Sequence, residues 1–187
     1  GDKVVLDCKV SLAIENDVPV LVAGDPLTRT VHEDALNNFD PTHNVDANNI
    51  EGSKGNNEGA KTVTSVFTHA ELAALVSAGA GEALTFSLNQ DLDGDPTGIT
   101  SKGSAVTWDV VSATEVHGVA AGGRIVFTVV QTAGVGTADP SDDAFTFTLL
   151  DQVYHLSALC DANASVALDL GDAFVASDFD GDKVVLD

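Results

Sequence analysis

Residues 178–187 read Asp178-Phe179-Asp180-Gly181-Asp182-Lys183-Val184-Val185-Leu186-Asp187. The last seven of them, 181–187, are identical to residues 1–7, at an offset of 180 residues. Self-similarity at a fixed distance is typical of a tandem array. We therefore interpret the chain as slightly more than one unit of a longer repeat. An engineered duplication of the boundary is the alternative, and it implies the same array.

A long alternating segment begins in the first copy of this heptapeptide. From Lys3 to Glu15, thirteen residues, the side chains alternate with a period of two, which predicts a half-buried β-strand. Such a strand is about 43 Å long at about 3.3 Å per residue, roughly twice the usual length. Pro19 in Asn16-Asp17-Val18-Pro19 ends it, because proline removes a ladder donor. We expect its first half to complete the preceding fold and its second half to reach toward the next.

The rest of the chain reads as short strands bounded by Gly, Pro and Asp turns, a pattern that predicts an all-β sandwich. Thr68-His69-Ala70-Glu71 has the spacing of a capping box and predicts one short helix, which Gly79 can close. Asn37 to Gly59 reads as a long loop, and Asp91 to Pro96 as a turn. The predicted strands are Val20–Ala23, Lys61–Phe67, Leu84–Leu88, Val106–Val110, Arg124–Gln131, Phe145–Leu149 and Val166–Leu170.

These signals predict a division of the chain. Residues 1–17 form a junction strand that is shared with, or equivalent to, the end of the preceding repeat. Residues 18–187 form one repeat, or two lobes that meet near residues 79–83, and residues 178–187 begin the next junction. Trp108 is expected in the core, because carbohydrate-binding platforms usually need more aromatic residues than this chain offers.

The charge is strongly acidic, with 29 acidic residues against 8 basic ones and a net charge of −21. This balance argues against nucleic acid and anionic lipid as partners. No apolar run has the length of about 18 residues that a membrane span needs. So many like charges repel in a compact state, so screening by salt or bound cations must offset them. Clusters of Asp with Gly and Asn favour hard cations, and we expect Ca²⁺; an acidic surface that serves solubility is the alternative.

Two D-x-D-G-D clusters are the principal candidates for Ca²⁺ ligands. Carboxylates at alternate positions of a tight turn can converge on one ion, although no Glu follows at the twelfth position, as an EF-hand would require. A hydrogen-bonded Asp turn without metal is the alternative for each cluster. The primary candidates are Asp91, Asp93, Asp95, Asp178, Asp180 and Asp182, and the secondary ones, near the junction, are Asp17, Asp25, Glu33 and Asp34.

Catalytic signals are weak. His32-Glu33 lacks the second His of a zinc-protease motif, and neither a G-x-S-x-G sequence nor a phosphate-binding glycine loop occurs. The five histidines are scattered, so we expect no enzyme and no small-molecule substrate. The two cysteines, Cys8 and Cys160, either form a disulfide or remain free thiols.

Six segments of the chain carry a family resemblance: V-H-E-D-A-L (31–36), L-V-S-A-G-A-G-E-A-L-T-F-S-L (75–88), A-G-G-R-I-V-F-T-V (121–129), F-T-F-T-L-L-D-Q-V-Y-H (145–155), V-A-S-D-F-D-G-D-K-V-V-L (175–186) and N-D-V-P (16–19). Together they resemble the tandem repeats of giant type I-secreted RTX adhesins of Gram-negative bacteria. The resemblance implies Ig-like β-sandwich extender modules, Ca²⁺ at loops and linkers, export in the unfolded state and display at the cell surface. The two cysteines depart from the family's pattern.

We therefore expect a non-catalytic extender repeat of a bacterial surface adhesin, stabilised by Ca²⁺, whose partners are neighbouring repeats of the same chain. Such repeats contact only their neighbours, so stiffness is set unit by unit and at each junction. The alternative is a Ca²⁺-dependent carbohydrate- or protein-binding module that uses the loop from Asn37 to Gly59 as its contact surface.

Overall fold

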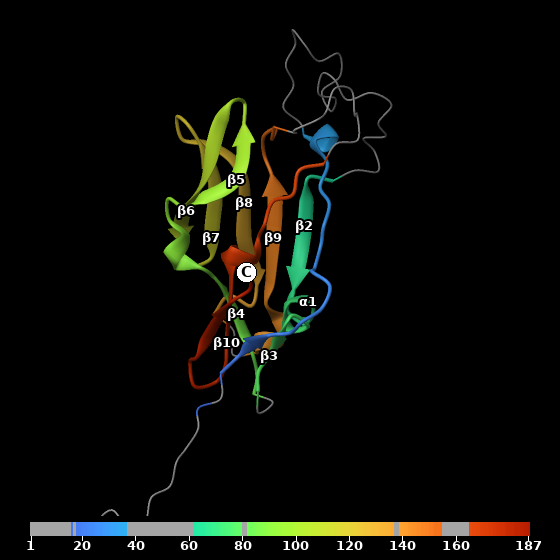
Figure 1. Ribbon diagram of the computed structural model, residues 1–187, viewed down its shortest axis with the longest axis vertical. Coiled ribbons are helices and arrows are strands. Elements are labelled where there is room, and N and C mark those ends of the chain that lie inside the picture. The colour runs from blue at the N-terminus through green and yellow to red at the C-terminus, as the bar shows by residue number, and fades with distance from the viewer. Residues whose placement is uncertain (1–15, 17, 37–61, 80–81, 137–138, 155–164) are drawn as a thin grey trace, which may run out of the picture.

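The structure is a computed structural model that describes residues 16, 18–36, 62–79, 82–136, 139–154 and 165–187. Within these residues the strands form three antiparallel sheets with one short α-helix and several 3-10 turns (Figure 1). This confirms the predicted all-β class. The strand predicted from Lys3 to Glu15, the loop from Asn37 to Gly59, and both cysteines lie outside the described residues.

The largest sheet has six strands in the order β2-β9-β8-β7-β6-β5, and every neighbouring pair is antiparallel. In β9, Phe145, Phe147 and Leu149 are buried and alternate with half-buried threonines, as a period of two predicts. The strands are β2 (Thr64–Thr68), β5 (Pro96–Ser101), β6 (Ser104–Ser112), β7 (Glu115–Ala120), β8 (Arg124–Ala133) and β9 (Ala144–Leu149).

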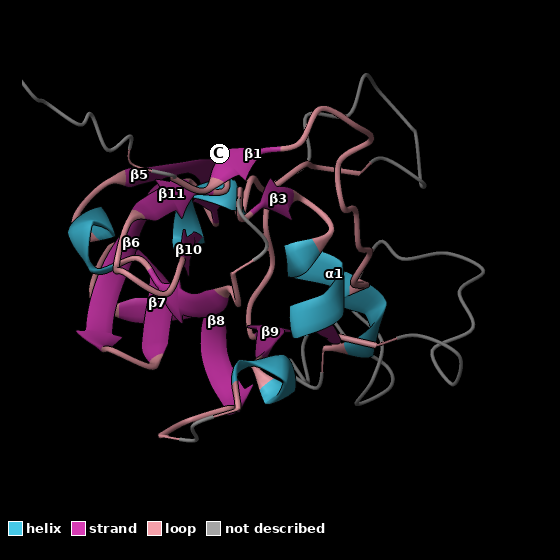
Figure 2. Ribbon diagram, turned by 90° about the horizontal axis from the view of Figure 1, so that it is seen from below, coloured by secondary structure: helices cyan, strands magenta, loops and turns pink. Residues whose placement is uncertain are grey.

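A smaller sheet of three strands has the order β11-β10-β4, with β4 (Thr85–Leu88), β10 (Phe174–Ser177) and β11 (Lys183–Val185). Strand β11 belongs to the second copy of the repeated heptapeptide, and it pairs with β10 from Val175↔Val185 to Ser177↔Lys183. A third sheet consists only of β1 (Val20–Leu21) and β3 (Val76–Ser77). Seen from the end of the molecule, β10 and β11 lie in a layer opposite β7, β8 and β9 (Figure 2).

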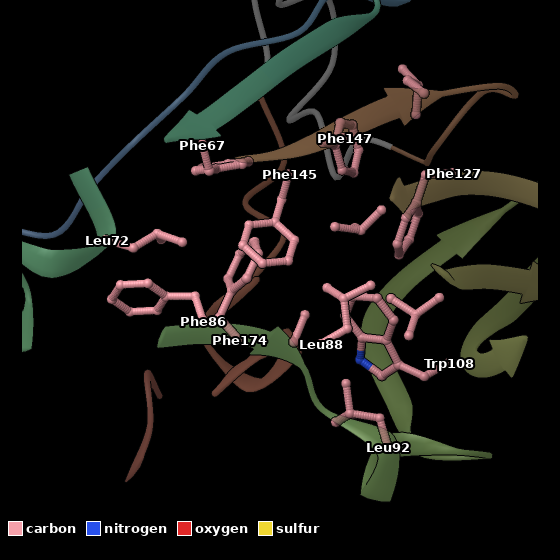
Figure 3. Packing of buried hydrophobic residues seen from close by; sticks show 14 of the residues in the cluster. Phe67, Leu72, Phe86, Leu88, Leu92, Trp108, Phe127, Phe145, Phe147 and Phe174 are labelled. Carbon is pink, nitrogen blue, oxygen red and sulfur yellow. The ribbon is translucent and has the colours of Figure 1, made fainter. Parts of the chain in front are cut away.

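The hydrophobic core lies between the six-stranded and the three-stranded sheets. Phe174 of β10 contacts Phe67 of β2 and Phe145 of β9, with ring centroids 5.5 and 5.2 Å apart (Figure 3). On the same side of the large sheet, Phe127 packs edge-on against Trp108, with the centroids 5.2 Å apart. Trp108 is 3% exposed, which confirms its predicted place in the core.

Gly118 of β7 leaves room for one of these rings. It is paired with Phe127 across the β7–β8 ladder, and a Cβ atom added to it would lie 2.1 Å from Cε1 of Phe127. A side chain at this position would therefore collide with the aromatic core. Glycine is used here for close approach and not for an unusual backbone angle.

The predicted helix begins as expected but ends early. In α1 (His69–Ala73), the Thr68 N–H and hydroxyl both donate to Glu71 Oε2 at 3.0 Å, which confirms the capping box. The prediction that Gly79 closes the helix is wrong. After Ala73 the chain turns into β3, where Val76 pairs with Leu21 of β1, and this tertiary pairing takes precedence over local helix propensity.

Some strand predictions also differ from the structure. Residues 165–170, which include the predicted strand Val166–Leu170, join no sheet, although Leu168 and Leu170 still pack against the core. The alternation of apolar residues in this segment reflects the partial burial of Leu168 and Leu170, without pairing with a neighbouring strand. The segment Asp91 to Pro96 is only partly a turn, because Pro96 already begins β5. Strands β3, β5, β7 and β10 were not predicted.

Candidate metal centre

The turn between β10 and β11, residues 178–182, is organised by one buried carboxylate. Asp178 is 6% exposed, and its Oδ1 accepts hydrogen bonds from Gly181 N at 3.0 Å and Asp182 N at 2.8 Å. Its own N–H donates to Asp182 O at 3.1 Å. Gly181 has a φ of +99°, a conformation that favours glycine. The sequence D-F-D-G-D therefore folds into a compact turn around Asp178.

Three carboxylates meet beside this turn. One oxygen each of Glu82, Asp178 and Asp180 lies within 4.8 Å of the others, and this is the only such group of three among the described residues. Glu82 reaches the turn because it comes three residues before Thr85, which pairs with Ser177 at the end of β10. The structure thus brings together the predicted Asp178 and Asp180 and adds Glu82, which sequence reasoning missed.

Electrostatic crowding is visible at Asp180. Its hydrogen bond with Asp178 raises its pKa, and desolvation and the negative charges of Asp178, Asp182 and Glu82 raise it further. Each of these effects disfavours an additional negative charge. A bound divalent cation would reverse the effect, because it attracts all of these carboxylates at once.

Asp182, the third predicted ligand of the cluster, has a different contact. Its Oδ2 accepts a hydrogen bond from Asn16 Nδ2 at 2.5 Å. Asn16 opens the Asn-Asp-Val-Pro segment that precedes β1, so this bond connects that segment to the turn. Asp17 lies outside the described residues.

The first D-x-D-G-D cluster does not form a comparable group. Asp91 is the acidic residue in a 3-10 helix (Gln90–Leu92), and its N–H donates to Asn89 Oδ1 at 3.1 Å. Asp93 Oδ1 accepts from Val110 N at 3.2 Å, and Asp95 O accepts from Trp108 N at 2.8 Å. In the structure these residues attach the turn to β6, and their three carboxylates are not gathered together.

The secondary candidates are also dispersed within the described chain. Glu33, in a 3-10 turn (Glu33–Ala35), accepts a hydrogen bond through Oε1 from Val153 N, beyond the end of β9. That contact lies at the end of the molecule opposite the Asp178 turn (Figure 1). Asp25 follows β1 and is not part of the three-carboxylate group, and the side chain of Asp34 is outside the described set.

Two other buried carboxylates, those of Asp151 and Asp143, form ion pairs or hydrogen bonds within the fold. Asp151 contacts Arg124 Nη1 and Lys102 Nζ, the latter at 2.7 Å. Burial alone raises the pKa of Asp151, but hydrogen bonds from Lys102, the Gln152 N–H and Arg124 outweigh it and lower the pKa. Asp143 Oδ2 accepts from Phe86 N at 3.0 Å and so connects the loop before β9 to β4.

The ligand types at the Glu82–Asp178–Asp180 cluster suit one class of ion. All three offer carboxylate oxygen, with no imidazole or thiolate, and hard oxygen donors are typical of Ca²⁺ and Mg²⁺ sites rather than of zinc or copper sites. Ca²⁺ accepts six to eight oxygen ligands in flexible geometry, so three carboxylates on a turn can be completed by backbone carbonyls and water.

Comparison of the chain with protein-family models, curated proteins and solved structures gave no match. Among the described residues, no helix has both the length and the apolar character needed to cross a membrane.

Proposed function

We propose that this chain is slightly more than one unit of a tandem array and that the unit is a non-catalytic, Ca²⁺-stabilised extender repeat of a secreted bacterial surface adhesin. One observation carries the proposal. The heptapeptide that recurs after 180 residues contains strand β11 (Lys183–Val185), which pairs with β10. The sequence that opens the next repeat thereby also completes the fold of this one.

The layers of the fold support an Ig-like β-sandwich as the extender module. A six-stranded and a three-stranded antiparallel sheet face each other across an aromatic core, which is the general arrangement of a sandwich. Such a module needs no catalytic site, and its elongated shape suits a spacer.

The path of the chain supports the shared strand. Asn16 and Asp182 are hydrogen-bonded, so the chain enters the repeat beside the turn from which β11 departs. Strand β11 then runs away from this end, and the chain reaches Asp187 part of the way along the molecule (Figure 1). In an array, the eight residues that separate Asp7 from Asn16 cover about 26 Å when extended. This path fits our proposal that the strand predicted from Lys3 to Glu15, which lies outside the described residues, pairs with one repeat in its first half and leads into the next in its second.

A Ca²⁺ ion held by Glu82, Asp178 and Asp180 would sit at the end where the chain enters. It would fix the β10–β11 turn against the segment that leads into β4 and so stiffen the junction. Because the ion binds only the folded state, its stabilisation grows as RT ln(1 + [Ca²⁺]/Kd). Low calcium inside the cell keeps the chain unfolded for export, and high calcium outside favours folding.

Exposed apolar side chains at the same end support contact with a neighbouring repeat. Phe179, at the tip of the β10–β11 turn, is 86% exposed, and Val20 of β1 is 50% exposed. Apolar surface of this kind is common where another protein surface docks. The alternative, a Ca²⁺-dependent carbohydrate- or protein-binding module, assigns its contact surface to the segment Asn37 to Gly59, outside the described residues.

Small-angle scattering on a polypeptide of three repeats tests the extender role. We expect its maximum dimension to shorten on chelation of Ca²⁺, and to be short in Asp178→Asn/Asp180→Asn even when Ca²⁺ is present. Asp91→Asn/Asp93→Asn is the matched control, since it alters the same motif where the carboxylates are not gathered, and it should behave like the unaltered protein. A maximum dimension that is indifferent to both chelator and Asp178→Asn/Asp180→Asn would refute the proposal.

A further inference from the structure

Strand β11 is an edge strand whose complete sequence also occurs at the beginning of the chain. We propose that the edge of β10 that holds β11 also accepts residues Gly1–Asp7 of a second copy of this chain. The result is non-covalent, head-to-tail association by strand exchange. This goes beyond the extender role, which joins repeats through the continuous backbone.

The contacts that hold β11 come from the heptapeptide alone. Ser177, Ala176 and Val175 pair with Lys183, Val184 and Val185 in turn. Leu186 N then donates to Phe174 O at 3.1 Å. Residues 1–7 have the same side chains in the same order, so they can make the same contacts on the β10 of another molecule.

The fit at the end of the heptapeptide is specific. A Cβ atom on Gly171 would lie 2.6 Å from Leu186 O and 2.9 Å from Cα of Asp187, so only glycine allows the strand to lie this close. Val184 and Leu186 are partly buried and pack against the core. In an exchanged strand, Val4 and Leu6 occupy these two places.

The opposite edge of the small sheet is less accessible. In β4, the other edge strand, the Phe86 N–H is already bound to Asp143 Oδ2. Strand exchange therefore proceeds through the place of β11, which gives the association a direction from the N-terminal segment of one molecule to the β10 of the next.

A second copy is favoured over the chain's own N-terminal segment. Strand β11 runs away from Asp182, and Asn16 is hydrogen-bonded to Asp182. Residues 1–7 of the same chain, once placed on β10, would have to return to Asn16 within residues 8–15. That segment, Cys-Lys-Val-Ser-Leu-Ala-Ile-Glu, contains no Gly, Pro, Asn or Asp, and Ser11 is its only residue of a type common in turns, so it is poorly suited to form the reversal. Docking on another molecule requires no reversal.

Exchange competes with the chain's own β11, which is tethered by a short turn. Short tethers give effective concentrations of about 1 mM or more. Exchange in the unaltered chain is therefore expected only near millimolar concentration, and at much lower concentration when β11 is disabled. The net charge of −21 also opposes association, so about 0.5 M NaCl, where the Debye length is below about 5 Å, is the suitable condition.

Identical changes in the two heptapeptides provide the test, with mass measured by sedimentation in NaCl and Ca²⁺. Val184→Asp/Leu186→Asp disables β11 and leaves the N-terminal donor intact, so we expect oligomers at about 50 μM, at least tenfold below the concentration that the unaltered chain needs. Val4→Asp/Leu6→Asp removes the donor and should remain monomeric up to about 1 mM. The variant with all four changes should be monomeric throughout.

If the loss of β11 unfolds the protein, the proposal is tested instead by adding a peptide that can replace β11. The peptide Gly-Asp-Lys-Val-Val-Leu-Asp, added to the fourfold variant, should raise its melting temperature, and Gly-Asp-Lys-Asp-Val-Asp-Asp should not. Monomers at every concentration in Val184→Asp/Leu186→Asp, or equal effects of the two peptides, would overturn strand exchange. Neither result would contradict the extender role, because that role is tested separately, with covalently linked repeats and a chelator.

Discussion

Beside the six-stranded sheet, just after β9, the buried carboxylate of Asp151 contacts Arg124 and Lys102, whereas at the edge of the three-stranded sheet the buried carboxylate of Asp178 lies beside Glu82 and Asp180. The first region supplies its own counter-charges. The second leaves acids facing one another and has an edge strand whose sequence recurs at residues 1–7. We infer that the contacts of Asp151 hold without a cation, whereas the turn at Asp178 is stabilised when a cation binds.

The largest expected effect is a difference in the free energy of unfolding between alanine variants of two phenylalanines, one in each region. Phe127→Ala removes a ring that is 0% exposed and should lower the free energy of unfolding by about 3–5 kcal/mol, with or without Ca²⁺. Phe179→Ala removes a ring that is 86% exposed and should change it by less than about 0.5 kcal/mol. Urea unfolding followed by circular dichroism measures both. A similar loss in the two variants would show that the turn belongs to the core.

Chelation tests the dependence of the second region on an ion. One site filled at about a hundred times its Kd contributes about 2.7 kcal/mol, or about 5–10 °C in melting temperature for a domain of this size. In Asp178→Asn this difference between Ca²⁺ and EDTA should vanish, because the amide oxygen can still accept from Gly181 N and Asp182 N but the charge is gone.

In EDTA, Asp178→Asn should melt no lower than the unaltered chain, since a repelling charge has been removed. Asp93→Asn, which keeps an acceptor for Val110 N, should retain the full shift with Ca²⁺. A Ca²⁺ shift of equal size in Asp178→Asn and the unaltered chain would place the ion elsewhere.

A smaller effect concerns acid sensitivity in the large sheet. The folded-state pKa of Asp151 lies below its ordinary value of 3.8. Its ionised form therefore adds stability that is present above pH 3.8 and is lost as pH falls through the folded-state pKa. Asp151→Asn should cost about 1.5–3 kcal/mol at pH 7, the range of a charge-assisted hydrogen bond, and should show a shallower loss of stability toward pH 3. Parallel pH profiles of the variant and the unaltered chain, measured in EDTA, would contradict this role.

Local sequence signals predicted the parts of the fold in which the pattern of neighbouring residues matches the secondary structure that they form. The alternation of Phe145 and Phe147 with threonine gave β9, and the spacing of Thr68 and Glu71 gave the start of α1. Strands β5 and β7 were missed because Pro96 and Gly98 occur in one and Gly118 in the other, and these residues weaken the local strand signal. Only their ladder partners make them strands.

The candidate site was predicted in part for a related reason. Asp178 and Asp180 are close in sequence, so their motif could be read directly. Glu82 joins them only because Thr85 pairs with Ser177, a long-range register that no local pattern shows. The same motif at Asp91 and Asp93 gives no cluster, because backbone groups of β6 engage it instead. Spacing indicates which carboxylates can converge, and the surrounding strands decide whether they do.

The position of Asn16 beside Asp182 has a mechanical consequence. In the proposed array, tension enters the fold near Asn16 and leaves it at Asp187, so the line of force runs along β11. Inter-strand hydrogen bonds of an antiparallel pair lie perpendicular to the strands. A pull along β11 therefore loads its bonds to β10 together, in shear, instead of peeling them apart one after another. The backbone of Leu186 and Asp187 packs closely against Gly171. This contact adds to the resistance at the end of β11 where the load is applied.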